Sequence, residues 1–415
     1  MSGVHRPGDP VDMAPPPAGE PMGGRRRVLF TTCPAAGHFF PMVPLAWALR
    51  SAGHEVLVAT PGSLVPEVTR AGLPVVACAD SYDMIEVMRP KNGGGGGPGG
   101  QPPRQNADPR QAVADTAQGF ARLAELALPG TMRLIERWRP DIVVSEPMEL
   151  AGPVAATRFG IPRVEHRWGL APRPDLQAAA TAAFRPATRV LATPHAAPPA
   201  ALIDVCPPGF QHHDVPVGDP MAYVPYNGPS VLPDWALRPA ERPRVCVTLG
   251  TVLPRYGRME PLLEKVMEAL AELDVEALVG MDESDATALR ATARLPQQVR
   301  AAGWLPLGAT LPLCDVIVHH GGSGTTMTSL VSGVPQLVLP HFADQFANAE
   351  RIAALGAGIR LGQDQVTAAS VREAVTALQG DSPQRKVSLA LAAESAAQPL
   401  PSEMAALVCE RAAAW

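Results

Sequence analysis

The clearest chemistry in the sequence lies in a segment rich in histidine, glycine and hydroxyl side chains, His319 to Thr326. It follows the short apolar run Val316–Val318 and precedes a helical pattern that ends near Val331, so a strand, a glycine turn and a helix start are predicted. Glycines let the main chain approach a ligand closely, and the first turn of a helix presents unpaired N–H groups and a partial positive charge. The segment therefore suits a phosphate, and the candidate phosphate-binding residues are His320, Gly321, Gly322, Ser323, Gly324 and Thr325.

Neither standard nucleotide loop fits this segment. It lacks the glycine spacing of a dinucleotide fingerprint and the Gly-Lys-Ser/Thr of a Walker loop, so a phosphate carried by something other than NAD or ATP is expected. The alternative is a glycine-rich turn that only packs a helix onto a strand.

His38 is the candidate general base. It follows the apolar run 28–32, and the carboxyl end of a strand is where open α/β sheets bind their ligands. Histidine can take a proton from an attacking group near neutral pH. A carboxylate can orient such an imidazole and stabilise its cation, so Glu146, which follows the predicted strand 141–145, is the candidate partner. The alternatives are a structural histidine and a hydrogen-bonded structural acid.

Residues Val316 to Asn348, with Pro340 and the Asp344-Gln345 pair, resemble the donor-site signature of nucleotide-sugar glycosyltransferases of the GT-B fold. The closest group is the family 1-type bacterial enzymes that decorate antibiotics and other natural products, such as macrolides, aromatic polyketides and enediynes. The resemblance extends from about Arg27 to Leu361, with several motifs in the right order. It implies an α/β protein of two facing Rossmann-like domains with parallel sheets and an interdomain cleft. It also implies an inverting sugar transfer in which His38 matches the family's catalytic histidine.

Two further motifs are similar to the family's donor site. Gly250 and Thr251 end the predicted strand 244–249, where a small residue and a hydroxyl would meet the pyrophosphate; the alternative is an ordinary strand-end turn. Trp304 could stack on the nucleobase while main-chain groups near Leu305 read its edge, unless Trp304 is a core residue.

The resemblance gives Asp344 and Gln345 the role of binding the hydroxyls of the donor sugar. An Asp that only caps a helix is the alternative. The long C-terminal box of the plant relatives is absent, and Leu307 replaces the Gln of their base-binding turn. Both departures favour a dTDP-sugar, with a deoxyhexose, over a UDP-sugar.

No metal ion and no other cofactor is expected. Many glycosyltransferases of the other fold class neutralise the departing diphosphate with a metal, but no Asp-x-Asp site with a suitable strand context occurs here. The pair Asp282 and Asp285 falls in a predicted surface loop. His320, Thr325 and the helix start could stabilise the developing charge instead.

The acceptor site is expected in the first domain. Its aliphatic and aromatic side chains suit an apolar natural-product aglycone, and the candidates are Phe39, Phe40, Met84 and Trp168. They do not identify the aglycone, and transfer to oxygen, nitrogen or carbon stays open.

Composition excludes several classes of protein. The 415 residues are 46% hydrophobic and 18% charged with a net charge of −5, so the chain can bury substantial cores but has no basic field for nucleic acid. No apolar run is long enough to span a membrane and no secretion signal is apparent. The six scattered cysteines have no Cys-x-x-Cys pair, which favours buried thiols in a reducing cytoplasm.

The sequence predicts five parts. They are a disordered tail (1–24), an acceptor-binding domain (25–222) with a flexible Gly/Pro loop (91–110), a Pro-rich linker (223–243), a donor-binding domain (244–400) and a last helix (401–415). In the family, this helix packs back on the first domain.

Three rival functions have less support in the sequence. A nucleotide-sugar epimerase of the same fold would need an additional carboxylate cluster, and a dehydrogenase would need the dinucleotide fingerprint. A catalytically inactive nucleotide-sugar-binding helper is disfavoured by the intact His38. A homodimer and a separate activating protein both stay open.

Overall fold

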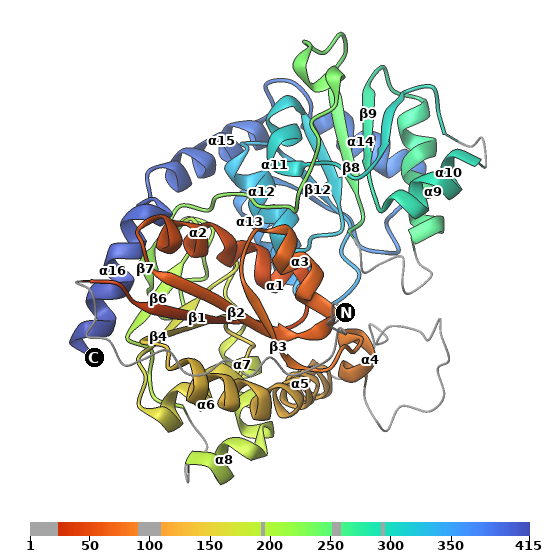
Figure 1. The fold of residues 1–415 in the computed structure, drawn as a ribbon. Coiled ribbons are helices and arrows are strands. Elements are labelled where there is room, and N and C mark those ends of the chain that lie inside the picture. The colour runs from red at the N-terminus through yellow and green to blue at the C-terminus, as the bar shows by residue number, and fades with distance from the viewer. Residues whose placement is uncertain (1–23, 90–108, 192–195, 251–258, 292–294) are drawn as a thin grey trace, which may run out of the picture.

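The computed structural model describes residues 24–89, 109–191, 196–250, 259–291 and 295–415. Two parallel β-sheets organise them, one in each half of the chain (Figure 1). The expectations for the N-terminal tail up to residue 23, for 91–108 and for Thr251 fall on residues outside these ranges.

The first sheet has seven strands in the order β3-β2-β1-β4-β5-β6-β7. Its strands are β1 (Arg27–Thr31), β2 (Glu55–Pro61), β3 (Val75–Ala79), β4 (Ile142–Ser145), β5 (Arg163–His166), β6 (Ala201–Asp204) and β7 (Asp219–Pro220). The helices of this domain are α1 (Ala36–Phe39), α2 (Val43–Ser51), α3 (Val65–Arg70), α4 (Met84–Met88), α5 (Pro109–Trp138), α6 (Ala151–Phe159), α7 (Pro174–Ala183) and α8 (Arg185–Leu191).

The second sheet has six strands in the order β10-β9-β8-β11-β12-β13. They are β8 (Arg244–Thr248), β9 (Glu276–Gly280), β10 (Val299–Gly303), β11 (Val316–His319), β12 (Gln336–Val338) and β13 (Gly358–Arg360). The helices are α9 (Met259–Ala271), α10 (Glu283–Ala291), α11 (Leu307–Thr310), α12 (Ser323–Val331), α13 (Gln345–Leu355), α14 (Ala368–Leu378), α15 (Pro383–Ala396) and α16 (Pro401–Ala414).

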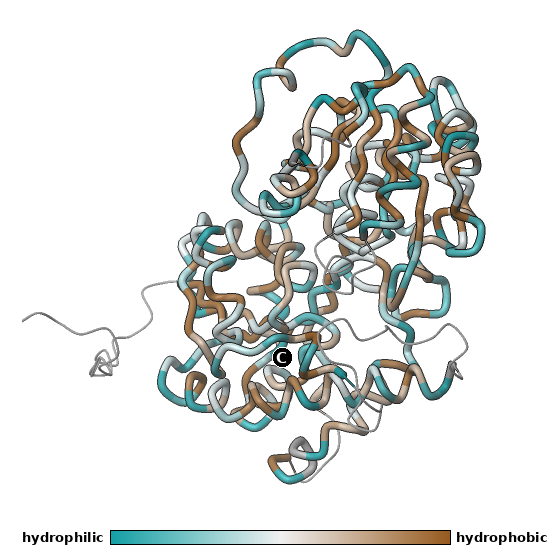
Figure 2. The backbone as a smooth tube through the Cα atoms, turned by 90° about the vertical axis from the view of Figure 1, so that its right-hand side faces the viewer, coloured by the Kyte–Doolittle hydropathy of each residue, from teal (hydrophilic) through white to brown (hydrophobic). Residues whose placement is uncertain are grey.

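The central strands are apolar on both faces because helices cover both sides of each sheet. In β1, Val28, Leu29 and Phe30 are all buried, and in β11 so are Val316 and Val318. Such continuous apolar runs are typical of parallel sheets with two covered faces. Figure 2 shows the same distribution, with hydrophobic segments inside each domain and hydrophilic ones on the outer loops. The predicted α/β class with two parallel-sheet domains is confirmed.

Each sheet has one point where the strand order reverses. In the first sheet it lies between β1 and β4, which pair in parallel with Thr31 beside Ser145. In the second it lies between β8 and β11, with Thr248 beside His319. Crevices at such switch points, at the carboxyl ends of the strands, are where α/β sheets bind ligands. The two candidate motifs of the sequence follow these strand ends.

The two domains share apolar packing. One continuous hydrophobic cluster includes Leu170 and Phe210 of the first domain and Met327 and Ile352 of the second. The segment after β5 lies so close to α12 that a Cβ on Gly169, whose φ is 154°, would stand 2.8 Å from Met327 Cγ. The segment after β5 therefore lies against the first turns of α12.

Helix α16 returns to the first domain, where it packs on α2 (Figure 1). Cys409 Sγ lies 3.4 Å from His54 Nε2, and the main-chain N–H of Arg26 donates to His54 Nδ1. Among the described ranges, no helix combines the length and the hydrophobicity that crossing a bilayer requires.

Candidate active site

The turn after β11 is built on His319, which is fully buried. Its Nδ1 accepts a hydrogen bond from the Gly321 N–H at 3.1 Å, and its Nε2 lies 2.9 Å from Gln336 Oε1. These contacts define the tautomer, because Nδ1 accepts and Nε2 must donate. Burial lowers the pKa of His319 to about 3, so the ring stays neutral. His319 therefore shapes the turn rather than meeting a ligand.

His320 points from the same turn into the region between β8 and α12. Its ring is packed between two glycines: a Cβ on Gly250 would stand 2.5 Å from Cε1, and a Cβ on Gly322 would stand 2.5 Å from Nε2. Burial also lowers the pKa of His320, to about 4, against the opposing charge of Asp344. Its Nδ1 is buried and has no hydrogen-bond partner among the described residues. The neutral ring thus keeps one unused polar atom.

The first turn of α12 offers main-chain N–H groups. Gly322 is the N-cap and provides no side-chain cap, so the first N–H groups of the helix are left for another partner. Gly324 borders open space, since a Cβ there would meet no atom within 4 Å. The hydroxyl of Ser323, which is predicted to bind the phosphate, donates to Asp344 Oδ2 at 2.8 Å. Thr325 is half-buried in this turn.

Helix α13 begins with the pair proposed to bind the sugar. Asp344 is exposed and caps no main-chain N–H, which removes the alternative of a simple capping Asp. Gln345 is buried, and its Oε1 accepts from the His341 N–H at 2.9 Å, so its amide nitrogen is the part left for a ligand. The preceding Ala343 has a φ of 53°, a strained conformation for a residue with a side chain and one that often occurs at functional sites.

Asn348, on α13, links this helix to the glycine turn after β11. Its Nδ2 donates to Gly321 O at 2.8 Å and to Ser323 Oγ at 3.2 Å. Helix α13 is thereby fixed to the glycine turn.

His38 and Glu146 meet at the switch point of the first sheet. His38 lies on α1, after β1, and Glu146 directly follows β4; His38 Nδ1 is 2.9 Å from Glu146 Oε1. The Glu146 side chain is fully buried and accepts N–H bonds from Cys33 at 3.2 Å and from Met148 at 2.7 Å. The His38 side chain keeps 17% of its surface exposed. The carboxylate therefore holds Nδ1, and Nε2 is the nitrogen left to act.

The charges of the pair stabilise each other. Burial alone would lower the pKa of His38, but the charge and the hydrogen bond of Glu146 outweigh it, so this pKa is raised. Asp344, from the other domain, adds to the rise. Burial alone would raise the pKa of Glu146, but His38 and the N–H donors lower it. An ionised Glu146 beside a histidine that can accept a proton is what a general base requires.

Aromatic rings enclose His38. The Trp168 ring lies 4.7 Å from it at 54°, and the Phe120 ring 5.9 Å away at 46°. Phe120 comes from α5 and is not among the acceptor candidates of the sequence. Met84 is half-buried and packs against the hydrophobic cluster that includes Phe120 and Trp168.

The other two acceptor candidates lie elsewhere. Phe39 is 1% exposed and belongs to the core, so its ring cannot face an acceptor, contrary to expectation. The reason is that successive side chains of a helix are rotated by about 100°, so that α1 turns Phe39 into the core while the His38 side chain stays partly exposed. Phe40 packs edge-on against Tyr226 at 5.0 Å.

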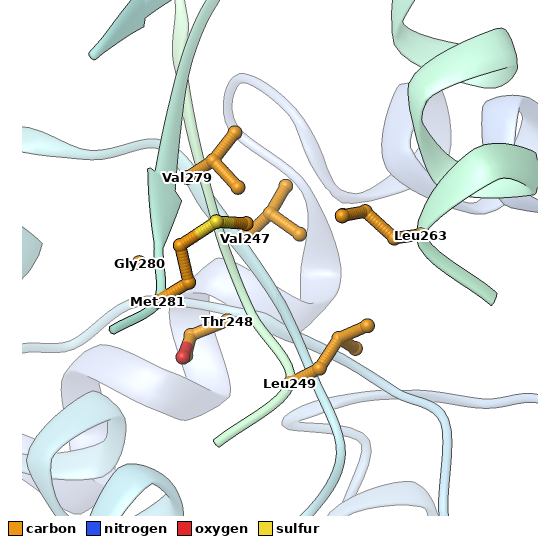
Figure 3. A pocket seen from close by; sticks show the side chains of 7 residues that line it. All are labelled: Val247, Thr248, Leu249, Leu263, Val279, Gly280 and Met281. Carbon is orange, nitrogen blue, oxygen red and sulfur yellow. The ribbon is translucent and has the colours of Figure 1, made fainter. Parts of the chain in front are cut away.

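The nucleobase candidates follow β10. Trp304 is 45% exposed, so it is not a core residue, whereas Leu305 is buried beside Leu278 and Ile317. Figure 3 shows the neighbouring crevice at the ends of β8 and β9, where Thr248 provides a polar side chain among apolar ones. The buried Leu305 anchors the main chain that presents the Trp304 indole.

One group of side chains could hold a metal ion among the residues that the structure describes. The ligand atoms of Cys33, His38 and Glu146 lie within 4.8 Å of one another. Burial keeps the pKa of Cys33 well above its ordinary value, so the thiolate that metals prefer is disfavoured. Hydrogen bonds already use the Glu146 oxygens.

Two switch-point sites, one with a histidine–carboxylate pair and one with a glycine-rich helix start, define a nucleotide-sugar glycosyltransferase of the GT-B fold. The chain belongs to the erythromycin biosynthesis protein CIII-like family, whose N-terminal domain matches residues 47–250 and whose C-terminal domain matches residues 264–410. It is a glycosyltransferase of the natural-product group, as the sequence predicts.

The chain is similar to characterised members of this group. It is 45% identical to the L-demethylnoviosyl transferase of Streptomyces niveus, over 91% of this chain and 96% of that protein. It is 36% identical to the elloramycin glycosyltransferase ElmGT of Streptomyces olivaceus, over 92% and 96%. The glycosyltransferase SsfS6 of Streptomyces sp. SF2575, solved in complex with thymidine diphosphate, matches with a TM-score of 0.80 and 34% identity over 93% of this chain and 100% of that one.

Proposed function

We propose that the enzyme transfers a deoxyhexose from a dTDP-sugar to an apolar natural-product aglycone, with inversion and without a metal ion. The observation that carries the proposal is the 2.9 Å contact between His38 Nδ1 and Glu146 Oε1 at one switch point, with the glycine turn at the other. Antibiotic-pathway sugar transferases are the relatives of the chain. The thymidine diphosphate in SsfS6 supports the choice of donor.

In O-transfer, the acceptor oxygen would attack the anomeric carbon from the side opposite the diphosphate. The new C–O bond would form as the bond from the anomeric carbon to the phosphate oxygen breaks, and its electron pair would leave with dTDP. The acceptor proton would pass to His38 Nε2, while Glu146 stabilises the imidazolium. His320 and the N–H groups at the start of α12 would stabilise the charge on the diphosphate.

Specificity would come from side chains beside these groups. Trp168, Phe120 and Met84 would form the apolar wall of the acceptor site. Trp304 would stack on the thymine, and Asp344 and the Gln345 amide would bind sugar hydroxyls, in which case the Ser323–Asp344 hydrogen bond would be exchanged for one to the sugar.

Calorimetric titration with dTDP, UDP and NAD tests the donor class. We expect the tightest binding for dTDP, weaker binding for UDP and none for NAD. Tighter binding of UDP would favour the alternative, a UDP-sugar-dependent enzyme, and binding of NAD alone would overturn the proposal.

Turnover of the His38→Ala variant separates an enzyme from an inactive nucleotide-sugar-binding helper. With a panel of dTDP-sugars and polyketide or phenolic aglycones, the wild type should form glycoside, and the variant should lose at least about 100-fold in kcat with unchanged dTDP affinity. Strong residual turnover would remove His38 as the base. Addition of EDTA should leave wild-type turnover intact; its loss would overturn metal independence.

A further inference from the structure

Arg351, on α13 of the second domain, holds a turn of the first domain. Its Nε donates to Phe210 O at 2.8 Å, and its Nη2 donates to Gly209 O at 2.9 Å and to Gln211 O at 3.0 Å. A planar guanidinium that donates to three successive carbonyls fixes geometry more closely than one flexible charge pair would. The turn is thereby bound to a helix of the other domain.

The same turn is held from a second helix. Glu394, on α15, accepts the Gly209 N–H at 2.7 Å. A Cβ on Gly209 would stand 2.6 Å from Glu394 Oε2, so a larger residue there would displace the carboxylate. Two helices of the second domain thus fix one turn of the first.

Gln211 transmits the position of this turn to the segment after β5. Its buried side chain accepts the Ala171 N–H at 3.1 Å through Oε1, and its Nε2 donates to Asp204 Oδ2 at 3.1 Å. Asp204 in turn forms a buried ion pair with Arg167 at 2.6 Å. Trp168 lies in sequence between the anchored residues Arg167 and Ala171, and its ring packs 4.7 Å from the His38 ring.

The other end of this chain of contacts is the glycine turn. Asn348, which donates to Gly321 O and Ser323 Oγ, precedes Arg351 by three residues and therefore lies on the same side of α13. Helix α13 thus connects the proposed phosphate site to the turn that holds the segment carrying Trp168, whose ring packs against His38.

We propose that Arg351 is a positioning residue for sugar transfer: it fixes the turn 207–211, and through Gln211 it fixes Trp168 against His38. The inference rests on the proposed function, because it assumes that His38 must be aligned with a donor held at Gly321–Ser323. Arg351 touches neither substrate nor His38, so its removal should impair the chemical step and leave the nucleotide site intact.

A double-mutant cycle tests the proposal. In the wild-type background, Arg351→Ala should lower kcat about ten-fold, because small misplacements of reacting groups are costly. The dTDP dissociation constant, measured by calorimetry, should change less than about two-fold. The reason is that the contacts of Asn348 with the glycine turn remain in the variant. In a Trp168→Ala background, the same substitution should lower kcat less than about two-fold, because its effect passes through Trp168. Equal losses in the two backgrounds, an unchanged kcat, or a matching loss of dTDP affinity would overturn the proposal.

Two further variants serve as a conservative replacement and a control. Arg351→Lys keeps a donor without the planar fork, so we expect a kcat between those of the wild type and Arg351→Ala; if the Ala variant does not fold, the Lys variant takes its place in the cycle. Arg372→Ala removes an arginine from α14 that pairs with Glu272 at the surface, and it should leave kcat unchanged.

Amide hydrogen exchange provides a readout without substrates. Arg351→Ala should raise the exchange rate of residues 167–171 about five-fold or more, since the anchoring of this segment by Gln211 is loosened. Unchanged exchange would refute the structural link even if no aglycone is turned over. A wild type that forms no glycoside from any donor would instead refute the proposed function, so the two failures are distinguishable.

Discussion

His38 and Glu146 come from the ends of neighbouring strands 108 residues apart in sequence, and their side chains meet at 2.9 Å. The strand pairing explains the meeting, because β1 and β4 are adjacent and in register at Thr31 and Ser145. Two N–H donors to the Glu146 carboxylate fix where it lies.

Glu146→Gln should lower kcat and shift its pH dependence. The charge of Glu146 raises the pKa of His38, whereas burial lowers it, so the variant should have a lower His38 pKa. A base is active when it is deprotonated, so the acidic limb of the kcat/KM profile should move to lower pH. The plateau of kcat should fall about 100-fold, because the imidazolium loses its partner. The measurement is a rate profile from acidic to alkaline pH.

A surface variant controls for a general loss of stability. Glu67→Gln removes a half-buried carboxylate outside the site, which pairs with Arg70 at 2.6 Å, and both the acidic limb of kcat/KM and the plateau of kcat should stay unchanged. A Glu146→Gln enzyme with a lower melting temperature but an unmoved limb would mean that Glu146 only supports the fold.

Gly250→Ala should weaken donor binding by displacing His320. The new Cβ would stand 2.5 Å from the His320 ring, and the φ of Gly250 is 70°. Gly72→Ala is a matched control, because its φ is 71° and its Cβ would meet no atom within 4 Å. Both variants should lose about 1–2 kcal/mol of stability from the left-handed backbone. Only Gly250→Ala should lower the affinity for dTDP, by about ten-fold or more, and equal affinities of the two variants would contradict the role of His320.

The sequence alone predicts the fold and the positions of the main motifs. The strand, glycine turn and helix after Val316 have strong local signals, and the structure has β11 and α12 at the predicted positions. A strand end is also a local property, so the sequence alone places His38 and Glu146 at the edge of a sheet, although it does not show their contact.

Contacts between distant segments are what the sequence does not contain. Residues 207–211 fall within the predicted acceptor-binding domain, and nothing in their sequence shows that Arg351 of the other domain holds this turn. Phe120 lies within a helix of ordinary periodicity, and only the tertiary fold brings it to His38. The burial of Phe39 depends in the same way on which side of α1 faces the core.

Stability should fall as the pH falls from about 6.5 to about 4, in part because of His166. This residue ends β5, is fully buried, and has no hydrogen bond to either ring nitrogen within the described ranges. Burial lowers its pKa to about 4, while in the unfolded chain the value is about 6.5. The unfolded state therefore binds a proton that the folded state does not bind. This lowers the free energy of unfolding by an amount on the order of 3 kcal/mol by pH 4. His319 and His320 act in the same direction.

His166→Phe isolates this contribution. Urea unfolding of the wild type and the variant at pH 7 and pH 5 gives the free energy of unfolding in each case. The decrease in the free energy of unfolding from pH 7 to pH 5 should be smaller in the variant by about 2 kcal/mol, which is the free energy that corresponds to about 1.5 pKa units. The exposed His213→Phe should keep the wild-type dependence, and an identical pH dependence of His166→Phe and the wild type would show that His166 is not a source of it.

Trp304→Ala should weaken nucleotide binding. Trp304 is 45% exposed, and an exposed indole held by a buried neighbour can stack on a pyrimidine. Loss of one such stacking contact costs about 1–3 kcal/mol, and Trp304→Phe should recover most of it because a ring remains. The measurement is calorimetry with dTDP and UDP. Trp47→Ala, at an indole of similar exposure (39%) in the first domain, should leave both affinities unchanged.

The comparison of the two nucleotides decides what Trp304 contacts. Stacking uses the face of the base, which thymine and uracil share, so dTDP and UDP should lose affinity by the same factor. If only dTDP binds more weakly, the indole contacts the thymine methyl group, and Trp304 is then the residue that selects dTDP over UDP. If neither affinity changes, the base lies elsewhere, and the main chain around Leu305 loses its proposed role as well.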